Sequence, residues 1–166
     1  MMLQQLLEQK RDIILKKWID QTFNTYEPEM VRFLKNEKNQ FANPVRNTIV
    51  CCLEKLYDSL LKGIGVDEYQ ELGEIIKIRA VQDFSPSNAL SFLFGLKKIV
   101  REELANNSQQ EKLIKELCVF EEKIDTLLGL AFDLYTQSRD KIHELRLAEV
   151  KARSPGIFEN LRRSKK

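Results

Sequence analysis

Residues able to do acid–base, nucleophilic or metal chemistry are few and scattered. His143 is the only histidine of the 166 residues, and it lies in a charged segment near the end of the chain. Neither a cysteine nor a carboxylate stands at a spacing from it that would form a metal site or a nucleophile–base pair. The adjacent acids at 102–103 and 121–122 are typical of solvated helix faces, and no glycine-rich phosphate loop occurs. We therefore expect a non-enzymatic protein without metal or cofactor, with His143 on its surface.

The three cysteines, Cys51, Cys52 and Cys118, give no disulfide framework, because their number is odd and two are adjacent. On a helix, Cys51 and Cys52 would point about 100° apart and would not hold one metal together. We interpret all three as small buried hydrophobic residues. A redox-sensing thiol is the alternative.

One polar stretch, residues 78–90, separates two apolar runs. Ser85 followed by Pro86 is typical of a helix N-cap and first helical residue, so one helix should end near Asp83 and another begin at Pro86. Arg79 and Asp83 stand four apart, which predicts a helical ion pair. Polar groups beside apolar helices need partners. They form either a structural cluster or a sensing site, and the candidate residues are Arg79, Gln82, Asp83, Ser85 and Asn88.

Six helices are expected to position this stretch, at residues 3–26, 28–35, 44–62, 67–83, 86–104 and about 108–152. A second cap-and-proline signal, Asn43-Pro44, starts the third of them, and Phe41 is placed to pack back onto it. Trp18 should anchor the first helix in the core. Helix 86–104 is apolar nearly all round, which predicts a central, buried helix. Within it, Gly95 permits close approach of another helix or leaves room for a small ligand.

The last helix is too long for a domain of this size. Its predicted length is some 40 residues, or roughly 60 Å. Apolar residues alternate three and four apart along its first half, as in a heptad seam that packs in the core or at a dimer interface. They are Leu117, Phe120, Ile124, Leu127, Ala131 and Leu134. The second half is expected to project as a coiled-coil stalk, and a break near 137–140 is the alternative. Ser108 to Glu111 is typical of a capping box.

Composition and charge exclude other classes of protein. Hydrophobic residues make up 43% and charged residues 31%, and no apolar window is long enough to span a membrane. Residues 151–166 carry six basic side chains against one acid, a net +5, which leaves −3 for the rest of a chain whose total is +2. This balance argues against nucleic-acid binding. We expect a cytoplasmic domain at 1–150 and a basic, flexible tail at 151–166.

Several segments occur in the same order in a known family. The polar stretch at 78–90 closely resembles the signature of the RsbRD N-terminal domain family, the sensor domains of the RsbT co-antagonist proteins. The likeness covers about residues 3–150. The similar segments are Leu6–Trp18, Tyr26–Pro28, Phe33–Lys35, Phe41–Val45, Ile78–Leu90 and Leu96–Leu104.

The resemblance implies a globin-like helical sensor domain that forms a dimer and holds no haem. His143 agrees, because it is not where a proximal haem ligand is expected. In the stressosome proteins of the general stress response, such a domain precedes a STAS output domain that docks a kinase. No STAS domain follows in this sequence, which ends at Lys166. We expect a stand-alone sensor or adaptor, with a truncated chain as the alternative.

The sequence thus predicts an all-α signalling domain that is not an enzyme. The leading interpretation is an RsbR-type sensor or adaptor that detects a small apolar ligand or a signalling protein near the 79–88 joint and relays it through a homodimer. The other interpretation is a purely structural dimerisation module that senses no ligand.

Overall fold

Each of the four prolines stands at the start of a helix. Pro28, Pro44, Pro86 and Pro155 occupy the first turn of α3, α4, α6 and α8, where the missing N–H group costs nothing. The computed structural model describes residues 2–63, 67–105 and 111–164, and within them helices joined by turns and loops form the predicted all-α fold, with no strand. The helices are α1 (Met2–Gln9), α2 (Arg11–Phe23), α3 (Pro28–Asn36), α4 (Pro44–Lys62), α5 (Asp67–Val81), α6 (Pro86–Leu104), α7 (Glu111–Arg153) and α8 (Pro155–Arg163).

The prediction of one helix over 3–26 is wrong, because the helix is interrupted at Lys10. This residue has φ −96° and ψ 9°, which separates α1 from α2. Its Nζ donates to the backbone carbonyl of Glu103, 2.6 Å away at the end of α6. The interruption thus lies where a remote element holds the chain. Together with α8, it accounts for eight helices in the described residues instead of six.

The core forms around α6, the predicted central helix. Trp18 is fully buried in α2, and its indole N–H donates to the Phe92 carbonyl at 2.7 Å, which confirms its anchoring role. A Cβ atom at Gly95 would collide with the side chain of Gln21 on α2. Gly95 therefore serves close helix approach. Helix α6 is not buried on every side, however, because the Phe94 side chain is 57% exposed.

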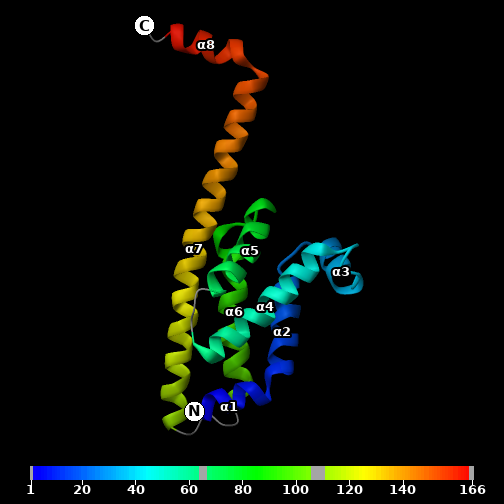
Figure 1. The fold of residues 1–166 in the computed structure, drawn as a ribbon, viewed down its shortest axis with the longest axis vertical. Helices are drawn as coiled ribbons and strands as arrows, with labels where there is room; N and C mark the ends of the chain where they lie inside the picture. The colour runs from blue at the N-terminus through cyan, green and yellow to red at the C-terminus, as the bar shows by residue number, and fades with distance from the viewer. Residues whose placement is uncertain (1, 64–66, 106–110, 165–166) are drawn as a thin grey trace.

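Helix α7 runs unbroken for 43 residues, about 64 Å at 1.5 Å per residue, so the predicted alternative of a break near 137–140 is wrong. Figure 1 shows its first part beside α5 and α6, and its last part extending beyond the other helices to α8. Of the predicted seam, Phe120, Ile124, Leu127 and Ala131 are buried. Leu117 and Leu134 are partly buried. The seam therefore packs mainly inside this chain.

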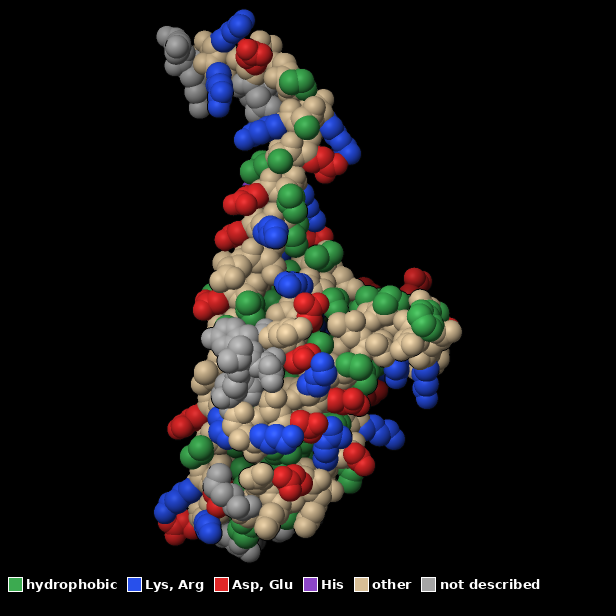
Figure 2. Space-filling view, in the orientation of Figure 1, with side chains coloured by type: hydrophobic (Ala, Val, Ile, Leu, Met, Phe, Trp, Pro, Cys, Tyr) green, Lys and Arg blue, Asp and Glu red, His purple; other side chains and the backbone are tan. Residues whose placement is uncertain are grey.

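The surface corrects other expectations. Cys52 is buried, but Cys51 and Cys118 are exposed, so the prediction of three buried thiols is wrong for two of them. His143 is exposed, as predicted. Figure 2 shows side chains of both charges spread over the visible face and along the projecting part of α7. Across the described residues, no helix is both long and apolar enough to cross a membrane. The predicted caps at Ser108–Glu111 and at Asp67 lie outside the described residues and side chains.

Candidate ligand site at the joint of α5 and α6

The joint between α5 and α6 is a tight turn followed by a capped helix start. Helix α5 ends at Val81, and Asp83 takes the left-handed conformation with φ 58°. Asp tolerates this region better than most residues, because its short side chain can bond locally. Ser85 then caps α6, as predicted, its Oγ accepting from the Asn88 backbone N–H at 3.4 Å. The chain therefore reverses within residues 82–85.

Arg79 lies beneath this turn with 0% of its surface exposed. Its guanidinium donates to the carbonyl of Asn88 at 2.9 Å, the carbonyl of Thr22 at 3.2 Å and the hydroxyl of Thr25 at 3.0 Å. The predicted ion pair with Asp83 is wrong. Arg79 instead ties α5 to the end of α2 and the start of α6, because its planar fork can reach three acceptors at once.

Aromatic rings enclose the same guanidinium. The Arg79 Cζ atom lies 5.3 Å from the ring centre of Tyr26, 4.8 Å from that of Phe84 and 5.3 Å from that of Phe92. No carboxylate of the described residues pairs with it, and its Nε has no hydrogen-bond partner. Burial lowers the pKa of Arg79 to about 10, so the side chain still carries its charge at neutral pH. The joint thus contains a buried cation held by neutral groups alone.

The other side of the joint is attached to α7. The Asp83 carboxylate pairs with Arg139 at 2.6 Å and with Arg146 at 3.7 Å. Arg139 also donates to the Ala80 carbonyl at 2.9 Å, and the Tyr135 hydroxyl donates to the carbonyl of Phe84. The hydrogen bond from Arg139, followed by the charge of Arg146, lowers the pKa of the Asp83 carboxyl.

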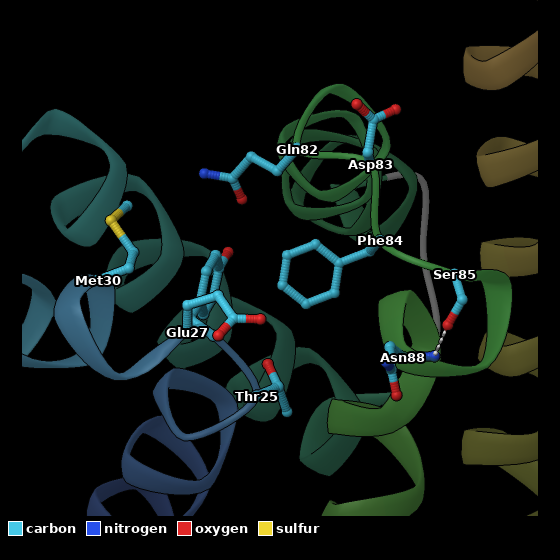
Figure 3. Close-up of a pocket in the computed structure, with 9 residues that line it drawn as sticks. Thr25, Glu27, Met30, Gln82, Asp83, Phe84, Ser85 and Asn88 are labelled. Carbon is cyan, nitrogen blue, oxygen red and sulfur yellow. Dashed lines mark hydrogen bonds between the residues drawn. The ribbon is translucent and has the colours of Figure 1, made fainter.

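A cavity of about 370 Å³ opens on the face of the joint that Arg79 underlies. Figure 3 shows the Phe84 ring pointing toward Glu27, the Gln82 side chain extending toward Met30, and the Asp83 carboxylate directed away from the centre. This volume is at the lower end of the range, about 300–1,000 Å³, for small-molecule sites. The lining residues are Thr25, Tyr26, Glu27, Met30, Gln82, Asp83, Phe84, Ser85 and Asn88.

The predicted polar cluster and this cavity overlap in part. Gln82, Asp83, Ser85 and Asn88 all line it, whereas Arg79 lies behind its rings. Sequence reasoning missed the opposite wall, which the α2–α3 connection supplies. The Tyr26-Glu27-Pro28 segment is part of the family resemblance, but nothing in its sequence indicates which residues it faces.

The second predicted motif lies in a separate, self-contained loop. Asn43 caps α4 as predicted, its Oδ1 accepting from the Arg46 backbone N–H at 3.1 Å. Its Nδ2 donates to the carbonyls of Phe33 and Glu37, both at 3.2 Å. Phe41 is 87% exposed, so the predicted packing against α4 is wrong. The described residues contain no group of three His, Cys, Asp or Glu side chains suited to a metal ion.

Comparison with known proteins identifies the family. Over residues 12–150, the sequence matches the RsbT co-antagonist protein rsbRD N-terminal domain. The chain belongs to this family. The match extends from α2 into the projecting part of α7, so the rsbRD N-terminal domain includes both walls of the cavity and the α7 residues that hold the joint.

A relative of this rsbRD-type domain is an uncharacterized protein of Archaeoglobus fulgidus. The two are 33% identical over 103 residues, which is 60% of this chain and 64% of that protein. The chain thus spans slightly less than two thirds of that relative's length. No solved structure matches this chain. The family membership shows a regulatory signalling domain.

Proposed function

We propose that this domain is a non-enzymatic sensor that detects a small molecule at the joint cavity and passes the change to α7. It would act in the cytoplasm, without haem, as part of a signalling complex of the stressosome type. We expect the absorption spectrum of the purified protein to show no Soret band. The residues assigned to detection are Gln82, Ser85 and Asn88, with Arg79 supporting them from behind.

One observation supports this proposal above the others: the segment 82–85 lines the cavity, and two of its residues, Asp83 and Phe84, also bond to α7. Residues 82–85 line the cavity. Asp83 and the Phe84 carbonyl bind Arg139 and Tyr135 of α7. A ligand that moves the Phe84 ring would therefore strain the hydrogen bonds that join Asp83 and Phe84 to α7. Coupling of this kind needs an element with contacts to both sites, and the joint is such an element.

The test fills the cavity with a larger side chain on its α3 wall and measures amide hydrogen exchange in α7. Met30 lies on α3, whose main helix contact is with α2 and not with α7, so Met30→Trp adds bulk to the cavity from the side away from the long helix. We expect amide hydrogen exchange over residues 135–146 to change by about threefold or more. Phe33→Trp is the matched control, since Phe33 is on α3 outside the cavity and 44% exposed.

A second variant separates relay from general disturbance. Adding Arg139→Gln to Met30→Trp removes the bonds to Asp83 and to the Ala80 carbonyl. The exchange difference over 135–146 should then shrink, although the bond from the Tyr135 hydroxyl to the Phe84 carbonyl remains. Unchanged exchange in Met30→Trp itself would contradict the relay.

The proposed dimer uses the outer face of α6 and α7. The salt bridges Lys97–Asp125 and Arg101–Glu121 join these helices in an antiparallel arrangement, and extrapolating their register by one turn pairs position 94 with position 128. Phe132 lies one helical turn after Leu128 and is 52% exposed, and Phe94 is 57% exposed. Gly129 has open space where a Cβ would be, which allows a second helix to approach closely. This patch is also the observation that favours the alternative, a dimerisation module that senses nothing.

Light scattering distinguishes the patch from the stalk. Phe132→Glu should convert a dimer to a monomer, because it places a charge in an apolar contact. Truncation after Ser138 should leave the dimer intact. A monomer on truncation together with a dimeric Phe132→Glu would assign association to the projecting helix. A dimer that shows no exchange response in Met30→Trp would support the structural alternative.

A further inference from the structure

Helix α8 lies beyond the core, at the end of the projecting part of α7 (Figure 1). Ser154 makes the corner between the two helices, with φ −136° and ψ 58°, and Pro155 begins the new helix. Within the described residues, the main helix contact of α8 is with α7. Helix α8 therefore contributes little to the packing of the domain.

This end of the molecule combines an amphipathic sequence with exposed apolar side chains. The sequence of α8 has the periodicity of an amphipathic helix. Near the end of α7, Leu147 is 44% exposed and Val150 is 51% exposed, and residues three apart share a helix face. An amphipathic helix of a globular domain normally lays its apolar side on the core. Because α8 lies beyond the core, a partner outside the domain must supply that apolar surface.

The same end is positively charged. Residues 151–164 contain four basic side chains and one acid, a net charge of +3, and all five are exposed. Figure 2 shows Lys and Arg side chains projecting in several directions around this end. Two of the arginines pair within their own helices, Arg153 with Glu149 at 2.6 Å and Arg163 with Glu159 at 3.8 Å. Such exposed pairs contribute little to stability, so these arginines remain available to an anionic partner.

We propose that α8 binds the surface of an anionic lipid bilayer. A basic amphipathic helix lies in the plane of such a surface, with its apolar side at the boundary of the acyl chains and its basic residues among the lipid phosphates. The corner at Ser154 lets α8 lie along the bilayer while α7 leads away from it to the rest of the domain. Nucleic acid would match the charges but offers no apolar layer, so the combination favours lipid. This inference states where the domain lies rather than what it detects, so it does not depend on a ligand at the cavity.

Sedimentation with lipid vesicles tests the proposal on the full chain. One set of vesicles contains phosphatidylcholine alone, and the other contains equal amounts of phosphatidylcholine and phosphatidylglycerol. We expect the chain to bind the anionic vesicles at least about tenfold more tightly than the neutral ones. Added salt should weaken this binding, because it screens the charges of the basic residues and the lipid phosphates.

A charge-reversal variant assigns the binding to α8. Arg162→Glu combined with Arg163→Glu should weaken binding to the anionic vesicles by at least about tenfold. Arg32→Glu combined with Lys38→Glu is the matched control, because it makes the same change of net charge at two exposed positions on and just after α3. These positions are remote from α8, so the control should change the affinity by less than about twofold.

A neutral variant tests the apolar contribution. Leu147→Gln combined with Val150→Gln removes exposed apolar surface near α8 without changing the charge, and it should weaken binding to anionic vesicles by about threefold. Leu145→Gln is the control, because Leu145 is 63% exposed on the other side of α7, and it should change the affinity by less than about twofold.

Three outcomes would overturn the proposal. One is the absence of binding to either kind of vesicle, and another is equal binding to both. The third is binding to heparin, a soluble polyanion, as tightly as to anionic vesicles, together with full affinity in the variant that changes Leu147 and Val150. That result would assign this end of the molecule to soluble polyanions. None of these outcomes bears on ligand detection at the cavity, which the hydrogen-exchange test of Met30→Trp addresses separately.

Discussion

Two joints of this domain begin with the same local signal and are held in different ways. At Asn43-Pro44, the capping side chain is buried, and its three hydrogen bonds reach only residues 33–46. At Ser85-Pro86, the cap is exposed and weak, at 3.4 Å. Bonds to α2 and α7, which are remote in sequence, hold that second joint instead: Arg79 donates to the Thr22 carbonyl of α2, and Arg139 of α7 donates to the Asp83 carboxylate.

The difference shows what a capping signal determines. It fixes where a helix starts, because the proline and the capping oxygen act locally. It does not determine whether the joint closes on itself or connects distant helices. A joint that closes on itself can only stabilise, whereas one held from two sides can transmit a change between them. This contrast agrees with the proposal of sensing at 82–85 and supports the proposal of a structural role for 36–43.

The largest effect is expected from Arg79→Ala. The substitution leaves three acceptors without their donor and opens a cavity among three rings. We expect a loss of about 3 kcal/mol, which lowers the melting temperature by roughly 6–12 °C. Calorimetry against Arg32→Ala, an exposed arginine on α3, gives the control. Unchanged stability together with altered ligand or partner binding would instead make Arg79 a sensing residue.

Next in size is the contrast between the two caps. Asn43→Ala should cost about 2 kcal/mol, the upper end for caps, because Asn43 is 1% exposed and loses three bonds. Ser85→Ala should cost about 0.5 kcal/mol, since the Ser85 hydroxyl is exposed and its contacts with the Asn88 N–H and the Ser87 hydroxyl are both long, at 3.4 Å. Urea unfolding of both variants measures the two values. Equal costs would contradict the division between a self-contained joint and one held by remote helices.

Local patterns predicted the helices well, because they depend on neighbours in sequence. The starts at Pro28, Pro44 and Pro86 and the ends at Lys62 and Leu104 follow from caps, glycine and periodicity. The fully helical class and the long last helix followed in the same way. The family was also predicted, from the segments that carry the resemblance.

Features decided by remote contacts were not predicted. Lys10 interrupts a continuous apolar pattern at the point where its side chain bonds to Glu103 of α6, 93 residues later in the chain. Arg79 and Asp83 stand at ion-pair spacing, but the left-handed Asp83 directs its carboxylate to α7 while Arg79 turns inward. The Tyr26 wall of the cavity comes from a connection 50 or more residues earlier in the chain. Periodicity contains no information on such pairings.

A smaller effect should come from the link to α7. Asp83→Asn keeps a residue that tolerates φ 58° and removes the charge that Arg139 and Arg146 face. We expect the melting temperature to fall by under about 3 °C at neutral pH, and by less in 1 M salt. Exchange over 135–146 should rise. Asp83→Gly, which also accepts this backbone, should match it if charge is the cause.

The pH dependence of this link follows from the lowered pKa of Asp83. A carboxyl whose folded-state pKa is lowered stabilises the fold above its unfolded value, near 3.8, and that contribution is lost as the pH falls through the folded-state pKa. The wild type should therefore exceed Asp83→Asn in melting temperature at pH 7, and the difference should narrow as the pH falls below about 3.8. A constant difference across this range would show that the carboxylate does not act through its charge.

The smallest effect is expected from Phe41→Ala. The Phe41 side chain is 87% exposed, so it buries little apolar surface on folding, and removing it loses little of the stabilisation that comes from such burial. The Phe41 backbone N–H, which donates to Asn39 Oδ1 at 2.9 Å, is unaffected by the substitution. Unfolding should change by less than about 0.5 kcal/mol. A cost of 1 kcal/mol or more would show that the 36–43 loop packs against another part of the protein or a second copy, and so is not self-contained.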